Sequence, residues 1–153
     1  MADPKIPPRE VPQNDAGYFE KITQAVFQAG FSWEVVRNKW PNFQQAFAHF
    51  DIDIVANFTE EDVERLLEDR GIIRNGRKIE ATIKNARTCQ HLIAKHGSFK
   101  AYLDSLDAVD YNQRAKKFSK QFKFMGAMGA YFFFWSVGAE VPPYEEWRAS
   151  QEK

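Results

Sequence analysis

The sequence predicts an all-α fold of about seven or eight helices in a single domain. Apolar residues recur at three- and four-residue spacing along most of the 153-residue chain, and only a short stretch around Val55 resembles a strand. Glycines and capping side chains divide this pattern into helix-length segments. The length suits one domain, because a chain of this size buries roughly two thirds of the surface that it exposes when unfolded.

Residues 1–14 are expected to form an extended arm that precedes a helical domain over residues 15–153. Four prolines in the arm remove backbone donors and favour extended structure. They are Pro4, Pro7, Pro8 and Pro12. The chain has no apolar run of about 18 residues and no signal-peptide pattern at its start, so we expect no membrane contact and a cytoplasmic location.

Three helices are expected after the arm. The first ends at Gly30, a residue type that is common just past helix C-termini. Ser32 can cap the second helix, whose apolar positions lie within residues 33–40. Pro41 suits the first turn of a helix, and we expect it to open the third, which carries Phe50.

The middle of the chain is expected to hold two more helices. An acidic capping sequence at Thr59 begins one that Gly71 ends. After a polar turn at residues 74–77, apolar residues from Ile79 to Ile93 predict a long helix.

The last third of the chain is first basic and then apolar. After a short segment around Phe99, a basic stretch over residues 114–123 leads into a dense apolar helix that runs to Val137. Gly138 follows, where a C-terminal glycine is expected.

The formal net charge of zero hides an uneven distribution. Residues 1–69 carry 6 basic and 13 acidic side chains, whereas residues 70–124 carry 13 basic and 4 acidic. A basic stretch of this kind is typical of nucleic-acid binding. Solvated helix faces are the alternative interpretation.

The single cysteine, Cys89, excludes an internal disulfide and a multi-cysteine metal site, which fits a reducing compartment. The three histidines, His49, His91 and His96, form no metal-ligand pattern with it. We therefore expect no metal and no cofactor.

Three stretches of the chain occur together in a specific order. They are Gln28-Ala29-Gly30-Phe31-Ser32-Trp33, then residues 60–67 with 71–74, 78–79 and 85–87, and finally Phe122-Lys123-Phe124-Met125-Gly126. In these stretches the chain resembles the DNA-3-methyladenine glycosylase I family, a branch of the helix-hairpin-helix DNA glycosylases. The resemblance extends over residues 18–138 and implies a helix-hairpin-helix glycosylase fold.

The resemblance also implies an enzyme that excises alkylated bases by hydrolysing the N-glycosidic bond in base-excision repair. Its partner is then double-stranded DNA with a damaged base, which is swung out of the duplex. We expect a monomer that associates with the nucleoid when it is on DNA. Two alternatives stay open: a DNA-binding module on the same scaffold that does not cut, and a scaffold that contacts proteins through aromatic residues 131–135.

By the same resemblance, Met125, Gly126 and Ala127 form the hairpin whose backbone N–H groups meet a DNA phosphate. Glycine permits close backbone approach, and a helix N-terminus favours an anion. The side chains expected at the DNA backbone are Lys120, Lys123, Arg74 and Lys78. The alternative is that Gly126 and Gly129 serve only helix packing.

Gly30 and Phe31 match the turn from which related enzymes push an apolar side chain into the gap left by the flipped base. Trp33 matches an aromatic residue of the base pocket, where its π-face suits a cationic purine. The positions expected at this pocket are Trp33, Gln28, Phe27 and Ala25. Core packing is the alternative for Phe31 and for Trp33.

The chain departs from the family at its base-reading and zinc positions. Ala25 stands where the family has a carboxylate that recognises the alkylated adenine, and Pro143 and Trp147 align with zinc ligands. Glu145 and Glu146 lie 19 and 20 residues past the hairpin glycine, where other helix-hairpin-helix glycosylases place a catalytic aspartate. We therefore expect one of these two carboxylates to be catalytic, by stabilising the developing positive sugar or by positioning water; a solvated tail is the alternative.

Overall fold

A long helix, α5 (Gly76–His96), organises the fold in this computed structural model, which describes residues 7–151. Within those residues the chain forms nine α-helices and two short 3-10 helices and no strand, so the all-α prediction is confirmed. The other α-helices are α1 (Asp15–Gln28), α2 (Trp33–Ala46), α3 (Ile52–Ala56), α4 (Glu60–Leu67), α6 (Phe99–Ser105), α7 (Tyr111–Gln121), α8 (Ala127–Ser136) and α9 (Tyr144–Gln151). The 3-10 helices are η1 (Ala48–Phe50) and η2 (Leu106–Ala108).

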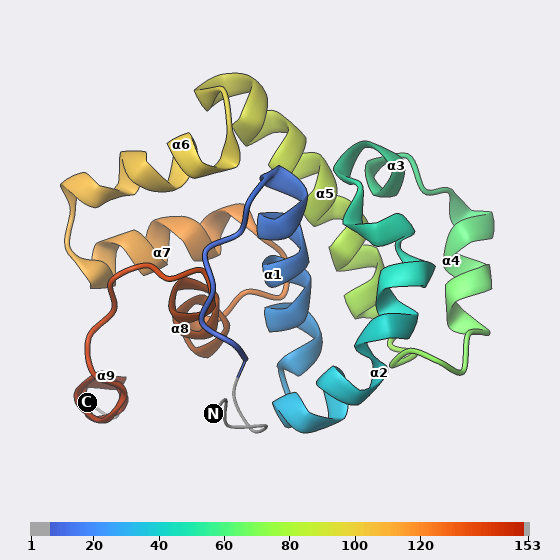
Figure 1. The fold of residues 1–153 in the computed structure, drawn as a ribbon, viewed down its shortest axis with the longest axis horizontal. Coiled ribbons are helices and arrows are strands. Elements are labelled where there is room, and N and C mark those ends of the chain that lie inside the picture. Colours follow the sequence, from blue (N-terminus) through green and yellow to red (C-terminus); the bar gives the residue numbers. More distant parts are fainter. Residues whose placement is uncertain (1–6, 152–153) are drawn as a thin grey trace.

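Helix α1 lies at the centre of the fold. It packs on α5 and on α8, while α2, α3 and α4 lie on one side of it and α6 and α7 on the other (Figure 1). The side chains that pack around α1 are mainly aromatic. The fully buried phenylalanines are Phe19, Phe27, Phe43, Phe47, Phe50, Phe99, Phe118, Phe133 and Phe134. None of the described helices is long and apolar enough to cross a membrane.

Helix α2 shows that one sequence prediction is wrong. The helix predicted to open at Pro41 is the continuation of the one before it, with the proline inside α2. A proline in a helix interior costs about 3 kcal/mol, because it removes a hydrogen bond. The buried rings of Trp40 and Phe43 stack at 4.9 Å on either side of this position. Each such burial contributes about 1.5–3 kcal/mol, which is enough to keep the helix continuous.

The segment Ala48–Phe50 also differs from the prediction, which placed Phe50 on a regular helix. All three residues have positive φ angles, between 53° and 60°. Phe50 is only 1% exposed, and its ring stacks on Trp40 at 5.3 Å. Packing of this ring therefore offsets the strain of the left-handed turn.

Most helix boundaries agree with the sequence signals. Ser32 accepts a hydrogen bond from the Val35 N–H at the start of α2, and Asn75 caps α5 in the same way through Lys78 N. The stretch around Val55 is the short helix α3. Glu145 and Glu146, for which a solvated tail is the alternative interpretation, lie on the short helix α9.

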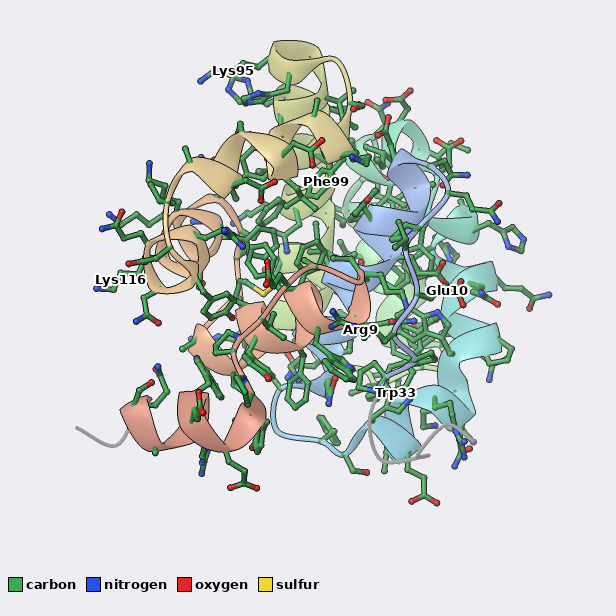
Figure 2. The ribbon with its side chains drawn as sticks, turned by 60° about the vertical axis from the view of Figure 1, so that its left-hand side comes forward. Arg9, Glu10, Trp33, Lys95, Phe99 and Lys116 are labelled. Atoms are coloured by element: carbon green, nitrogen blue, oxygen red, sulfur yellow. The ribbon has the colours of Figure 1, made fainter. Side chains whose placement is uncertain are left out.

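The described part of the arm, residues 7–14, contains no helix and runs along the end of α8. Arg9 donates to the carbonyls of Trp135 and Ala139, and the Glu10 N–H donates to Ser136 O at 2.8 Å. Figure 2 shows Arg9 and Glu10 on the segment that passes across this face. Pro4 lies outside the described residues, and the division of the chain at residue 14 stays a prediction.

Candidate nucleic-acid interface

The turn between α1 and α2 presents an aromatic ring to solvent. Gly30 has a φ of +84°, a conformation that glycine adopts without strain. Phe31 follows at the tip, with its N–H bonded to Gln28 O at 2.8 Å and its side chain 44% exposed. Core packing does not account for a ring this exposed, so Phe31 is available to a ligand.

The buried side chain of Lys78 fixes the backbone of this turn. The side chain is only 3% exposed, and its ammonium donates to the backbone carbonyls of Phe27 and Ala29 at the end of α1. The same ammonium lies 4.9 Å from the centroid of the Phe31 ring, a cation–π distance. Burial lowers the pKa of this lysine. The prediction that Lys78 contacts a DNA phosphate does not fit this placement, because its donors are used inside the protein.

The residues expected at the base pocket are all buried, and they do not all face one place. Phe27 packs edge-on against Phe43 at 4.7 Å, in the core between α1 and α2. It therefore supports the helix packing and is not free to line a pocket. Trp33 is 3% exposed, and its ring lies 6.4 Å from that of Trp40. Ala25 is buried on α1.

Two glutamines flank Ala25 on the surface of α1. Gln24 and Gln28 are one helical turn apart and each is 8% exposed. Both side-chain oxygens are buried without a hydrogen-bond partner. A buried acceptor left unpaired costs about 1–3 kcal/mol, so these two amides are suited to receive a donor from a ligand or a water. Sequence reasoning missed Gln24, although a polar residue on this apolar face was a visible signal.

The hairpin between α7 and α8 leaves the start of α8 open. Gly126 is the N-cap and offers no side-chain cap to the first-turn N–H groups. A Cβ added at Gly126 would meet nothing within 4 Å, so packing does not explain this glycine. At Gly129, by contrast, a Cβ would lie 3.1 Å from the Met125 sulfur. The packing alternative therefore fits Gly129, whereas Gly126 leaves room for an anion at the helix N-terminus.

Asn85 fixes the backbone of this hairpin. Its amide nitrogen donates to Lys123 O at 3.1 Å, and its amide oxygen accepts from Lys123 N at 2.7 Å. The side chain is 1% exposed, so both bonds are shielded from water. Residues 85–87 are part of the resemblance, but the sequence assigns Asn85 no contact, because an asparagine on a helix has many possible partners.

Helix α5 thus sets the spacing between the two loops. Lys78 and Asn85 are seven residues apart, which is two turns, so their side chains leave the same face of the helix about 10 Å apart. One holds the Phe31 turn and the other holds the hairpin. Two loops far apart in the sequence are therefore positioned by one rigid element.

The other cations predicted at DNA are exposed. Lys120 and Lys123 flank the hairpin, and Arg74 precedes α5. Lys116 extends outward from α7 (Figure 2). A cavity of about 490 Å³ between α7 and α9 is lined by Lys116, Lys120 and Ala127, among others, so positive charge continues beside the start of α8.

Glu145 and Glu146 lie on the exposed first turn of α9. Neither takes part in an ion pair within residues 7–151. In both figures α9 lies apart from the start of α2, where Trp33 is found. The catalytic role of these carboxylates stays a prediction.

Helix α9 is attached by aromatic contacts, and one of them involves Trp147, a position where the resemblance implies a zinc ligand in the family. Trp147 stacks on Tyr131 at 4.5 Å, and the Tyr131 hydroxyl donates to Pro142 O. Across residues 7–151, the structure groups no three histidine, cysteine or acidic side chains that could hold a metal ion. Cys89 is buried, and burial raises the pKa of its thiol.

Comparison with known proteins gives consistent matches. The family model described as methyladenine glycosylase matches residues 10–125. DNA-3-methyladenine glycosylase 1 of Escherichia coli (strain K12) is 49% identical over 78 residues, which are 50% of this chain and 42% of that protein. DNA-3-methyladenine glycosylase of Haemophilus influenzae is 39% identical over 69 residues, or 45% of this chain and 37% of that protein. The matched segments therefore span less than half the length of these two relatives.

Solved structures of similarly named proteins share the fold. A crystal structure of 3-methyladenine DNA glycosylase I has a TM-score of 0.73 and 34% identity, with 84% of this chain and 81% of that chain covered. The 3-methyladenine DNA glycosylase I of Staphylococcus aureus has a TM-score of 0.77 at 22% identity, with 88% and 82% covered. Because the family model matches most of its length, this chain belongs to the methyladenine glycosylase family.

Proposed function

We propose that this chain is a DNA glycosylase that excises alkylated bases, 3-methyladenine above all, by hydrolysis of the N-glycosidic bond in base-excision repair. The observation that carries the proposal is the placement of the Phe31 turn and the Gly126 hairpin on one face of α5, by Lys78 and Asn85. An enzyme that flips a base has to grip the backbone and fill the gap in the stack at the same time.

The gap-filling part belongs to Phe31. Its ring is exposed at the tip of a turn, and Lys78 supports it through two carbonyl bonds and a cation–π contact. A flat apolar ring that is held in this way can enter the space that a flipped base leaves. Trp33 lies two residues after Phe31, at the start of α2, and is then the aromatic residue that contacts the extruded base.

The backbone-gripping part belongs to the start of α8. The N–H groups of Ala127 and its successors lack a side-chain cap, and Gly126 leaves the approach open. A phosphate bound there interacts with the positive end of the helix dipole. Lys120 and Lys123, which precede Gly126 by six and three residues, add positive charge ahead of the helix.

Gln24 and Gln28 are the residues proposed to recognise the base, because the methyl side chain of Ala25 cannot form a hydrogen bond. An amide both donates and accepts, as the edge of a purine does. The demand on catalysis is small, because an alkylated purine carries positive charge and leaves readily once water attacks the sugar. The chain therefore retains a route to excision that does not need the family's carboxylate.

The proposal is tested by incubating the protein with an alkylated duplex and measuring released bases by chromatography. Excision predicts release of 3-methyladenine above the spontaneous rate. No release of any alkylated base, with binding to the same duplex retained, would favour the non-cutting DNA-binding module instead. The Phe31→Ala variant should lose release, whereas Leu67→Ala, an equally exposed residue on α4, should not.

Two further properties are proposed with this function. The protein acts as a monomer, because one hairpin and one wedge turn complete the DNA-contacting set within a single chain. It works in the cytoplasm and is found on the nucleoid when bound to DNA. Sedimentation of the protein with and without a short duplex tests the first of these.

A further inference from the structure

Phe124 is an exposed aromatic residue in a strained backbone conformation. It lies in the α7–α8 hairpin with a φ of +56°, a region that residues other than glycine rarely adopt. Its side chain is 42% exposed, and among residues 7–151 no aromatic pair includes it. Packing within the described part of the chain therefore leaves a large part of this ring open to solvent.

Phe50 provides the internal comparison. It has a similar φ of +60°, yet it is 1% exposed and stacks on Trp40. At Phe50 the strained backbone places a ring in the core, where its burial stabilises the fold. At Phe124 the strained backbone places a ring in solvent instead. Backbone strain without such a gain is characteristic of sites that bind a ligand.

The surroundings of Phe124 identify that ligand. Asn85 forms hydrogen bonds with both the N–H and the carbonyl of the preceding residue, Lys123, so the backbone from which the Phe124 ring projects is fixed. Gly126, at the open start of α8, is two residues further on, which puts it within about 7 Å along the backbone. The ring therefore borders the point where the proposed function places a DNA phosphate.

We propose that Phe124 is a second aromatic DNA contact, which packs on the sugar and base beside the phosphate held at the start of α8. This rests on the DNA binding that the proposed function requires. Phe31 and Phe124 then touch the duplex from two loops that α5 holds on one of its faces. Aromatic wedges and stacking residues act on DNA in this way, and they do so without reading its sequence.

The test measures three quantities for Phe124→Gly, Phe124→Leu and the wild-type protein. They are the affinity for an undamaged and an abasic duplex, the dependence of that affinity on salt, and the thermal midpoint. Ile54→Ala, an exposed apolar residue on α3, is the control for loss of surface. Lys123→Ala is the control for loss of a phosphate contact.

For Phe124→Gly we expect affinity for both duplexes to fall about 10-fold, as for the loss of one stacking ring. The salt slope should stay unchanged, because an apolar contact releases no counterion, whereas Lys123→Ala should flatten it. The thermal midpoint should not fall, because glycine adopts a positive φ without strain. Phe124→Leu should bind more weakly than wild type as well. Ile54→Ala should bind like wild type.

Unchanged affinity of Phe124→Gly, or a large fall in its thermal midpoint, would overturn the inference and make Phe124 a residue of the fold. Base release is measured in parallel to separate this outcome from the proposed function. A wild-type protein that binds DNA through Phe124 but releases no base would reject excision and keep this contact. A wild-type protein that binds no DNA would reject both.

Discussion

The side-chain amide of Asn85 forms two hydrogen bonds with the backbone of one residue, Lys123, at 3.1 and 2.7 Å. This pair fixes a hairpin to a helix that lies 38 residues earlier in the sequence. The Asn85 amide thus fixes the backbone of the hairpin, just as the Lys78 ammonium fixes the backbone of the Phe31 turn. The position of each DNA-contacting loop is set by a buried polar side chain of α5.

Loss of the Asn85 side chain should loosen the hairpin. Asn85→Ala removes both bonds, and we expect the free energy of unfolding to fall by about 2 kcal/mol. DNA affinity should fall as well, because the N–H groups at the start of α8 are no longer held in place. Urea unfolding and a duplex-binding titration check the two effects. Asn57→Ala, which removes an exposed amide bonded to Asp53 O, is the control and should change stability by less than about 0.5 kcal/mol.

Lys78→Met should separate base release from DNA binding. Methionine keeps the apolar stem but leaves the Phe27 and Ala29 carbonyls without their donor. The Phe31 turn should then become mobile, so that base release falls about 10-fold or more while affinity for undamaged duplex changes little. Lys84→Met, an exposed position on the same helix, should behave like wild type. Equal losses in release and in affinity would show that Lys78 acts on DNA directly.

The buried ammonium of Lys78 also predicts a dependence of stability on pH. Burial lowers its pKa below the ordinary value of 10.5, so the folded protein releases this proton at a lower pH than the unfolded chain does. Between the two pKa values the unfolded state binds more protons, and stability therefore rises with pH. The stability of wild type relative to Lys78→Met should increase as the pH rises toward 10.5 and should level off above it. Parallel urea-unfolding curves across that range would contradict the burial of a charged group.

The two glutamines of α1 should affect specificity more than stability. Gln24→Leu and Gln28→Leu each replace an unpaired buried oxygen by an apolar group, so we expect stability to stay the same or to rise by up to about 1 kcal/mol. Base release should fall, because the amides supply the hydrogen bonds to the base. Single-turnover release from an alkylated duplex is the measurement. Gln45→Leu, exposed on α2, is the control, and release that matches the control would reject the base-reading role.

The acidic pair on α9 can be tested by one double variant. If Glu145 or Glu146 stabilises the developing positive sugar, replacing both by glutamine should lower base release about 100-fold, without a change in affinity or thermal midpoint. Glu140→Gln, an exposed acid ahead of α9, should leave release unaltered. Release by the double variant at the wild-type rate would assign the pair to the solvated surface.

Several parts of this fold follow from local chemistry that is visible in the sequence. Ser32 caps the helix that it was expected to cap, and the spacing of apolar residues from Ile79 to Ile93 correctly predicts α5. Pro41 was misjudged because tertiary packing of the rings beside it outweighs a local preference.

The sequence predicts the two loops of the candidate site, but it does not predict the buried side chains of α5 that fix them. Phe31 and Gly126 were found from the resemblance, and both are exposed as a DNA contact requires. The resemblance places Lys78 at the DNA backbone, but the side chain is buried and donates to backbone carbonyls. Its burial depends on the end of α1, some 50 residues away in the chain, and no local pattern reports such a contact. The role of Asn85 escaped prediction for the same reason.

The most direct test of the account is the single-turnover rate of base release from an alkylated duplex, measured for wild type and for Phe31→Ala, with duplex affinity measured alongside. We expect wild type to release 3-methyladenine above the spontaneous rate, and Phe31→Ala to release it at least about 10-fold more slowly while still binding DNA. Release at the spontaneous rate by the wild-type protein, with tight DNA binding, would contradict the claim that this chain excises bases.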